Sequence, residues 1–125
     1  MNLPLERIAI NPKEIAQFRI VYDRKYDTLF VRPEPPRPAI AVDVAGEIWL
    51  RVDPETMQVV GLEIEDFATV FLKRHPDLAH FWREVQPSRL PWRRKGEMAT
   101  FALVLGEFVR RAFRSQLQQA HSPFT

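Results

Sequence analysis

The chain has 125 residues, of which 46% are hydrophobic and 27% charged, with a formal net charge of +2 and no cysteine. This length buries enough surface for one domain, residues 1–125, to fold without a disulfide or a metal. Without cysteine, the chain cannot carry a disulfide framework, a thiolate zinc site, a cysteine nucleophile or an iron–sulfur cluster. The first residues lack the basic and apolar stretches of a signal peptide, and no run approaches the roughly 18 apolar residues of a membrane helix. We therefore expect a cytoplasmic protein.

The first predicted element is a short helix from Pro12 to about Gln17. Asn11 is a favourable N-cap, Pro12 suits the first helical position, and Glu14 stands three residues after the cap, as in a capping box. The pattern after Gln17 changes to a period of two, so the helix is expected to be brief.

Five segments then alternate apolar and polar residues, the pattern of strands with one buried face. They are residues 18–23, 28–32, 40–44, 48–52 and 57–64. The first two predict a hairpin. A segment with proline at four of six positions, residues 33–38, separates this hairpin from the other three strands. The spacing predicts a five-stranded antiparallel meander over about residues 18–65.

Beyond Glu65 the apolar period changes to 3.6. Asp66 is expected to cap a first helix, which Pro76 ends, and Asp77 is expected to cap a second. Pro87 and Pro91 are then expected to end the second helix.

The longest predicted helix runs from Glu97 to about Gln119. Its apolar residues project within one continuous arc of about 140° when successive residues turn by about 100°, and they are Met98, Phe101, Ala102, Leu105, Phe108, Val109, Ala112 and Phe113. Strands followed by about three helices, in residues 66–120, predict an α+β fold in which the helices cover one sheet face.

The strand segment carries a resemblance, in Tyr22-Asp23, Asp27–Val31, Gly46–Asp53 and Val59–Ile64. From Tyr22 to about Phe67 these pieces resemble a small bacterial family catalogued as domain of unknown function 2283. The resemblance implies a compact antiparallel sheet followed by a helix and no established catalysis, and it admits an antitoxin-like partner role. The proline-rich insertion and residues 68–125 depart from the family pattern.

Few residues suit a catalytic or metal site. His75, His80 and His121 include no pair at the i+3 or i+4 spacing that places two ligands on one helix face. Glu63 and Glu65 are two apart on a predicted strand and therefore point to one face, where they would hold a cation or share a proton. The alternative is a solvated sheet face leading into a helix N-terminus, which favours acidic groups. We predict no cofactor, no metal and no catalytic residue, and enzyme activity at Glu63 and Glu65 stays an open alternative.

The net charge conceals a strong polarity. Residues 1–72 contain eight basic and 12 acidic residues, a net of −4, whereas residues 73–125 contain 10 and four, a net of +6. Basic residues around an aromatic side chain are typical of nucleic-acid contacts. The candidate contacts to nucleic acid or another anion are Arg89, Trp92, Arg93, Arg94, Lys95, Arg110, Arg111 and Arg114. The alternatives are a solvated helix face with a basic linker, a core position for Trp92, an acidic protein partner, or self-association of the acidic and basic halves.

The proline-rich segment allows one further interpretation. Arg32, Pro35 and Pro38 match the spacing of polyproline ligands, although a stiff strand connection explains the prolines equally. Taken together, the sequence predicts a non-catalytic interaction module that forms a homo-oligomer. The alternatives are a nucleic-acid-associated protein using Arg89 to Lys95, or a carboxylate-dependent enzyme.

Overall fold

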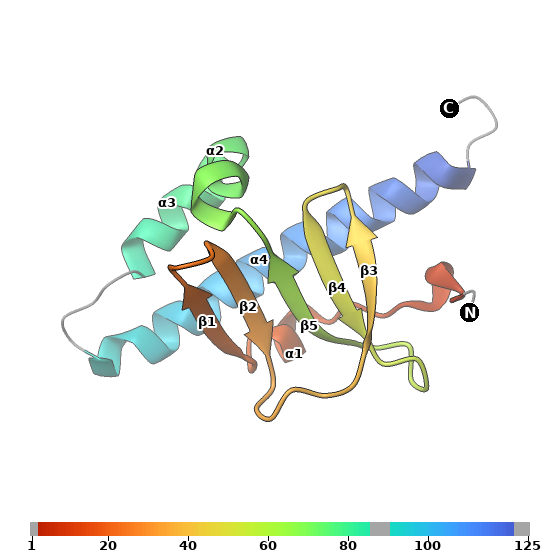
Figure 1. Cartoon of the computed structure of the whole chain (residues 1–125), viewed down its shortest axis with the longest axis horizontal. Coiled ribbons are helices and arrows are strands. Elements are labelled where there is room, and N and C mark those ends of the chain that lie inside the picture. Colours follow the sequence, from red (N-terminus) through yellow and green to blue (C-terminus); the bar gives the residue numbers. More distant parts are fainter. Residues whose placement is uncertain (1–2, 86–90, 122–125) are drawn as a thin grey trace.

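Five antiparallel strands form one open sheet in the computed structural model (Figure 1). The structure describes residues 3–85 and 91–121, and in the last helix it describes the side chains of residues 98–119. The strands are β1 (Arg19–Asp23), β2 (Thr28–Arg32), β3 (Ile40–Val44), β4 (Ile48–Val52) and β5 (Val59–Ile64). β5 begins two residues later than predicted, because the φ angle of Met57 is 61°, which keeps it in the preceding turn.

The spatial order of the strands is β1-β2-β5-β4-β3. The hairpin β1–β2 and the consecutive strands β3–β4–β5 form as predicted, and β5 joins the two units by pairing with β2. A meander in strict chain order would place β3 beside β2. Instead, the proline-rich connection passes β5 and β4 to reach the far edge of the sheet (Figure 1).

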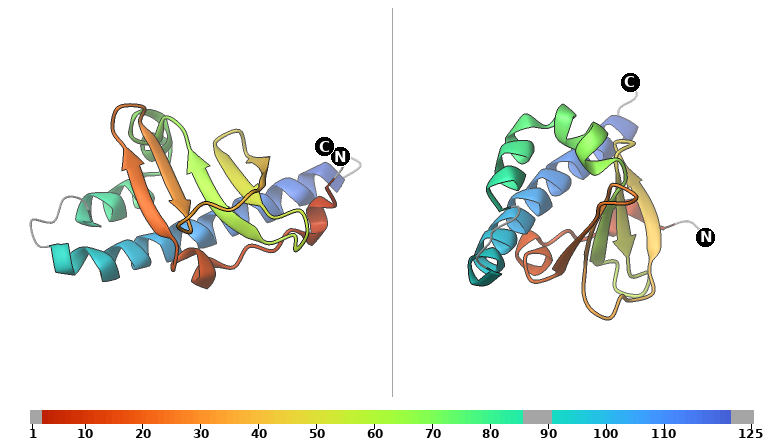
Figure 2. Two further views of the ribbon diagram at one scale, coloured as in Figure 1. Left: turned by 60° about the horizontal axis from the view of Figure 1, so that its bottom comes forward. Right: turned by 60° about the vertical axis from the view of Figure 1, so that its left-hand side comes forward.

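The helical elements are a 3₁₀ turn (Leu5–Arg7), α1 (Pro12–Ile15), a π-helical turn (Phe67–Phe71), α2 (Leu72–Arg74), α3 (Pro76–Val85) and α4 (Pro91–His121). Two views show α3 and α4 on the same face of the sheet, with α4 running across the strands (Figures 1 and 2). The α+β prediction, with C-terminal helices after an antiparallel sheet, is confirmed.

Two predicted helix starts are wrong. α4 begins at Pro91 rather than Glu97, so Pro91 starts a helix instead of ending one, and the predicted basic linker contributes the first turns of α4. α3 begins at Pro76, which places Asp77 inside its first turn rather than at its cap. Both corrections have one physical cause: proline is compatible with the first helical position, where no N–H group is needed for an intrahelical hydrogen bond.

The hydrophobic core lies between the sheet and α3 and α4. Its largest buried side chains include Leu29, Leu50, Leu62 and Ile64 from the strands and Phe67, Phe71, Trp82, Phe101, Leu105 and Phe113 from the helical part. Trp82 lies 5.1 Å from both Phe67 and Phe101, measured between ring centroids. The apolar stripe predicted for the last helix faces this core.

A close approach joins the N-terminal segment to α4. Asn11 accepts hydrogen bonds from the backbone of Lys13 (3.0 Å) and Glu14 (3.4 Å), which confirms the predicted cap of α1. A Cβ atom at Gly106 would lie 3.1 Å from the Cα of Pro12. Glycine at this position therefore lets α1 pack closely against α4.

Candidate functional site

The turn between β1 and β2 anchors the start of the helical half through one carboxylate. Asp27 accepts hydrogen bonds from the backbone N–H groups of Ala68 (2.8 Å) and Thr69 (3.0 Å), and from the Thr69 hydroxyl (2.7 Å). Tyr22 donates its hydroxyl to the same carboxylate at 2.6 Å. The predicted cap, Asp66, has a left-handed φ of 52° and makes no capping bond with its side chain. Asp27, distant in sequence, caps this helical turn instead.

These hydrogen bonds fix the ionisation of both partners. Partial burial raises the pKa of the Asp27 carboxyl, but the hydrogen bonds from Tyr22, Ala68 and Thr69 outweigh it and lower the pKa from 3.8 to about 2. Burial, followed by the hydrogen bond to Asp27, raises the pKa of Tyr22 from 10.0 to about 12. At neutral pH the link is therefore a phenol donating to a carboxylate, and it holds the π-helical turn at the end of β5.

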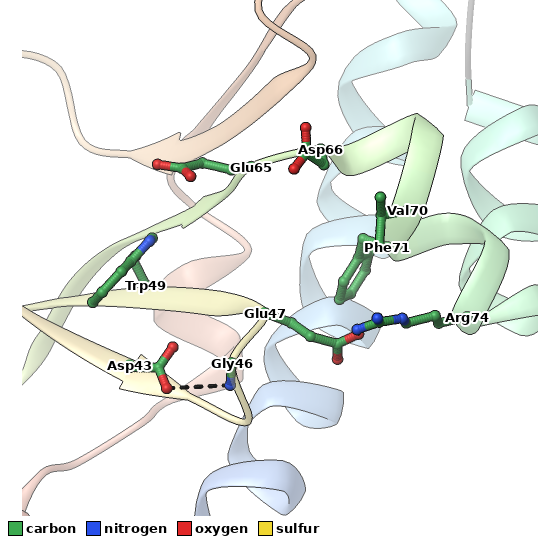
Figure 3. Close-up of a pocket in the computed structure, with 9 residues that line it drawn as sticks. All are labelled: Asp43, Gly46, Glu47, Trp49, Glu65, Asp66, Val70, Phe71 and Arg74. Carbon is green, nitrogen blue, oxygen red and sulfur yellow. Dashed lines mark hydrogen bonds and ion pairs between the residues drawn. The ribbon is translucent and has the colours of Figure 1, made fainter.

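A pocket of about 210 Å³ opens between the β3–β4 turn and this helical turn (Figure 3). Trp49 stands on one side of the hollow, and Val70 and Phe71 stand on the other. Phe71 is buried, whereas Trp49 is 38% exposed and Val70 is 39% exposed. We call this the Trp49 pocket; it is lined by Asp43, Gly46, Glu47, Trp49, Glu65, Asp66, Val70, Phe71 and Arg74.

One of the four carboxylates around the Trp49 pocket is neutralised within the fold. Glu47 accepts a hydrogen bond from Arg74 at 3.2 Å, and its other oxygen lies 2.9 Å from Nε2 of His75. The His75 ring in turn packs against Phe71 and Phe108, with centroids 4.6 and 4.7 Å away. The contacts of Glu47 with Arg74 and His75 connect the β3–β4 turn to α2 at one side of the pocket.

The other carboxylates leave the pocket with excess negative charge. Asp43 accepts a hydrogen bond from the backbone of Gly46 at 3.2 Å, within the turn. In the part of the chain that the structure describes, the exposed carboxylates of Glu65 and Asp66 have neither a hydrogen bond nor an ion pair. Arg74, already paired with Glu47, is the single basic residue among the lining residues.

An exposed indole beside unpaired carboxylates is suited to a cation. Tryptophan provides the most favourable aromatic face for a guanidinium or ammonium group, and nearby carboxylates add charge-assisted hydrogen bonds. Guanidinium fits better than ammonium, because its flat surface stacks on an indole while its edge donates to carboxylates. The Trp49 pocket therefore has the chemistry to hold an arginine side chain.

The two glutamates predicted as a carboxylate pair line different pockets. Glu63 lies on β5, borders a different pocket and is 4.0 Å from Arg51. Glu65 follows the end of β5 and lines the Trp49 pocket. Over residues 3–85 and the described side chains of α4, no group of three or more histidine or acidic side chains is arranged to hold a metal ion.

The predicted basic contacts fall into two groups. Arg89 lies outside the described residues, and Trp92, Arg93, Arg94 and Lys95 lie in the first turns of α4, where side chains are outside the described part. The backbone alone places these four on consecutive positions of one helix end, so the nucleic-acid interface stays a prediction.

The second basic group is described in full. Glu107 accepts hydrogen bonds from Arg110, at 2.5 and 3.0 Å, and from Arg111, at 3.2 Å, and these bonds lower the pKa of the Glu107 carboxyl to about 2. Arg114 is exposed and makes no ion pair with any described residue. Among the described side chains of α4, Glu107 thus partly neutralises the outer face, and the guanidinium of Arg114 stays unpaired.

Glu65 was predicted as a candidate site residue and Asp66 as a helix cap, but Trp49, Val70 and Arg74 were not predicted to form a site with them. Trp49 occupies an outward position of the alternating strand β4, where tryptophan is unusual, and this was the available signal. Val70 and Arg74 gave no such signal, because they reach the pocket only through the π-helical turn and its connection to α2.

Comparison with known proteins found no relative: no family model matches the chain, and neither a curated protein nor a solved structure matches it. The resemblance to domain of unknown function 2283 therefore stays a prediction. Within the described residues, no helix has both the length and the apolarity required to cross a bilayer.

Proposed function

We propose that this protein is a non-catalytic interaction module that self-associates, and that the Trp49 pocket accepts an arginine side chain from a second copy. The observation that supports this most strongly is the exposed indole of Trp49 beside the unpaired carboxylates of Glu65 and Asp66. A cavity with an aromatic wall and excess charge is a typical place for a buried anchor residue in an interface.

The same chain offers the complementary group. Residues 73–125 carry a net charge of +6 and residues 1–72 a net of −4. Arg114 on α4 is exposed and has no ion pair among the described residues, so it is the first candidate for the inserted side chain. In a twofold dimer each copy would donate one arginine and accept one, which fills both pockets at once.

Light scattering coupled to size-exclusion chromatography tests self-association. We expect a mass of about 29 kDa, twice the 14.7 kDa of one chain, with a shift towards the monomer as salt screens the charged contacts. Trp49→Ala and Arg114→Gln should each favour the monomer. Tyr26→Ala and Arg24→Gln are matched controls, since both residues are exposed and lie outside the Trp49 pocket.

Two results would overturn the proposal. A mass of 14.7 kDa at every concentration would exclude self-association. A dimer that Trp49→Ala and Arg114→Gln weaken no more than the two control variants would exclude the Trp49 pocket as its interface.

A further inference from the structure

A second pocket lies beneath the proline-rich connection between β2 and β3. It is small, about 70 Å³, and is lined by Arg32, Arg37, Arg51 and Glu63 together with Pro36 and the apolar residues Val60 and Leu62. The connection passes this end of the sheet on its way to the far edge (Figure 1). We call this the arginine pocket; it shares no lining residue with the Trp49 pocket, although Glu63 pairs in register with Trp49.

The fold places the Arg51 side chain firmly. Arg51 on β4 pairs in register with Gly61 on β5. A Cβ atom at Gly61 would lie 3.3 Å from Cγ of Arg51 and 3.2 Å from the carbonyl oxygen of Val31. The stem of Arg51 therefore packs over the glycine, and a Cβ atom at position 61 would require Arg51 or the Val31 carbonyl to shift slightly.

The guanidinium groups around the arginine pocket are poorly neutralised. Arg51 lies 4.0 Å from Glu63, and Arg37 lies 3.5 Å from Asp53, both long for charge-assisted hydrogen bonds. Arg32 packs over the ring of Phe30, 4.7 Å from its centroid, and makes no ion pair with a described residue. The lining itself holds three guanidiniums and one carboxylate, a nominal charge of +2 that does not count Asp53, which lies outside the lining.

Size and charge together specify a ligand. The volume equals that of about two water molecules in the liquid, which suits one oxyanion group and not a larger ring. Guanidinium forks match the oxygen atoms of phosphate in bidentate geometry, which makes arginine the preferred residue for such groups. We propose that the arginine pocket binds the phosphoryl group of a phosphate monoester, whose two negative charges balance the nominal +2 of the lining.

Titration of the ¹⁵N-labelled protein with inorganic phosphate, phenyl phosphate and dimethyl phosphate, followed at the arginine Nε–H signals, tests this site. Phosphate and phenyl phosphate should shift the signals of Arg32 and Arg51 in a saturable way, and the diester should bind at least about tenfold more weakly because it has one charge less. Binding should also weaken as salt is added.

Substitutions in the lining should change phosphate affinity in opposite directions. Arg32→Gln and Arg51→Gln should each weaken phosphate binding about tenfold or more, because each removes a charge-assisted hydrogen bond. Glu63→Gln should strengthen binding severalfold, since it removes the one carboxylate of the lining. Arg24→Gln, an exposed arginine outside the pocket, should leave binding unchanged.

The proposal fails if phosphate causes no saturable shift at Arg32 or Arg51, if the diester binds as tightly as the monoester, or if Glu63→Gln weakens binding. Because Glu63→Gln is expected to increase affinity, loss of folding in an arginine variant cannot imitate the full pattern. These outcomes do not depend on the Trp49 pocket, so either proposal can fail alone.

Discussion

Asp27→Asn tests how the sheet holds the first helical turn. The φ angle of Asp27 is 49°, in the left-handed region, which asparagine also adopts readily, so the substitution keeps the backbone and changes the side chain alone. An amide has one acceptor oxygen in place of two, so it cannot accept from Tyr22, Ala68 and Thr69 together with the present geometry. At least one of these donors would face the side-chain NH₂ group of the asparagine instead of an acceptor oxygen.

The pKa of Asp27 gives the expected magnitude. The difference between 3.8 and about 2, at about 1.36 kcal/mol for each pH unit, corresponds to roughly 2 kcal/mol in favour of the folded state. Asp27 is half-buried, so screening by solvent reduces this to about 1–2 kcal/mol. Because the folded pKa is lowered, this stability is present above the unfolded pKa of about 4 and is lost as the pH falls through about 2.

The contribution of Asp27 to the free energy of unfolding is measured by urea denaturation followed by circular dichroism. The wild type and Asp27→Asn are compared at several pH values. The free energy of unfolding should differ by about 1–2 kcal/mol at neutral pH, and the gap should narrow between about pH 4 and pH 2. All other acidic groups are common to both proteins, so their titration cancels in the difference. A difference that is constant from neutral pH to about pH 2, or absent throughout, would show that the ionised Asp27 carboxylate does not stabilise the helical turn.

Three further substitutions probe other parts of the fold. Tyr22→Phe should destabilise the protein by roughly 1–2 kcal/mol at neutral pH. Because the folded pKa of Tyr22 is raised, the stabilising contribution of its hydroxyl should be lost as the pH rises from about 10 through about 12. Denaturation at alkaline pH that shows no such loss would contradict this expectation. Gly106→Val should lower stability by more than about 2 kcal/mol, since its side chain would collide with Pro12, and an unchanged thermal midpoint would contradict the close approach. Trp49→Ala should change the free energy of unfolding by less than about 1 kcal/mol, because the indole is partly exposed, and a loss of about 3 kcal/mol or more would show that it belongs to the core.

The elements were predictable from sequence because their signals are local. Alternation over five residues defines β4, and the 3.6 period of α4 places Phe101, Leu105 and Phe113 on one buried stripe. The strand order was not predictable in the same way, because pairing of β5 with β2 depends on which strand completes the sheet after the proline-rich connection. Helix starts at Pro76 and Pro91 were misjudged because proline both ends one helix and begins another.

The candidate sites depend on contacts between distant segments, which one sequence does not show. Asp27 accepts a hydrogen bond from the backbone N–H of Ala68, 41 residues away in sequence. Local sequence therefore pointed to Asp66 as the cap, which is wrong. The polarity of charge was visible in the sequence, whereas the meeting of Trp49 with Glu65 required the tertiary fold. The outward tryptophan of an alternating strand was the one usable sequence signal for this pocket.

The proposed self-association requires the Trp49 pocket to hold a guanidinium group. The most direct measurement is a titration of the ¹⁵N-labelled protein with N-acetyl-arginine amide, following the indole N–H signal of Trp49, beside the same titration with the uncharged citrulline analogue. We expect a saturable shift with the arginine compound, little shift with citrulline, and weaker binding after Glu65→Gln together with Asp66→Asn. A Trp49 signal that does not move, or that responds equally to both compounds, would contradict it.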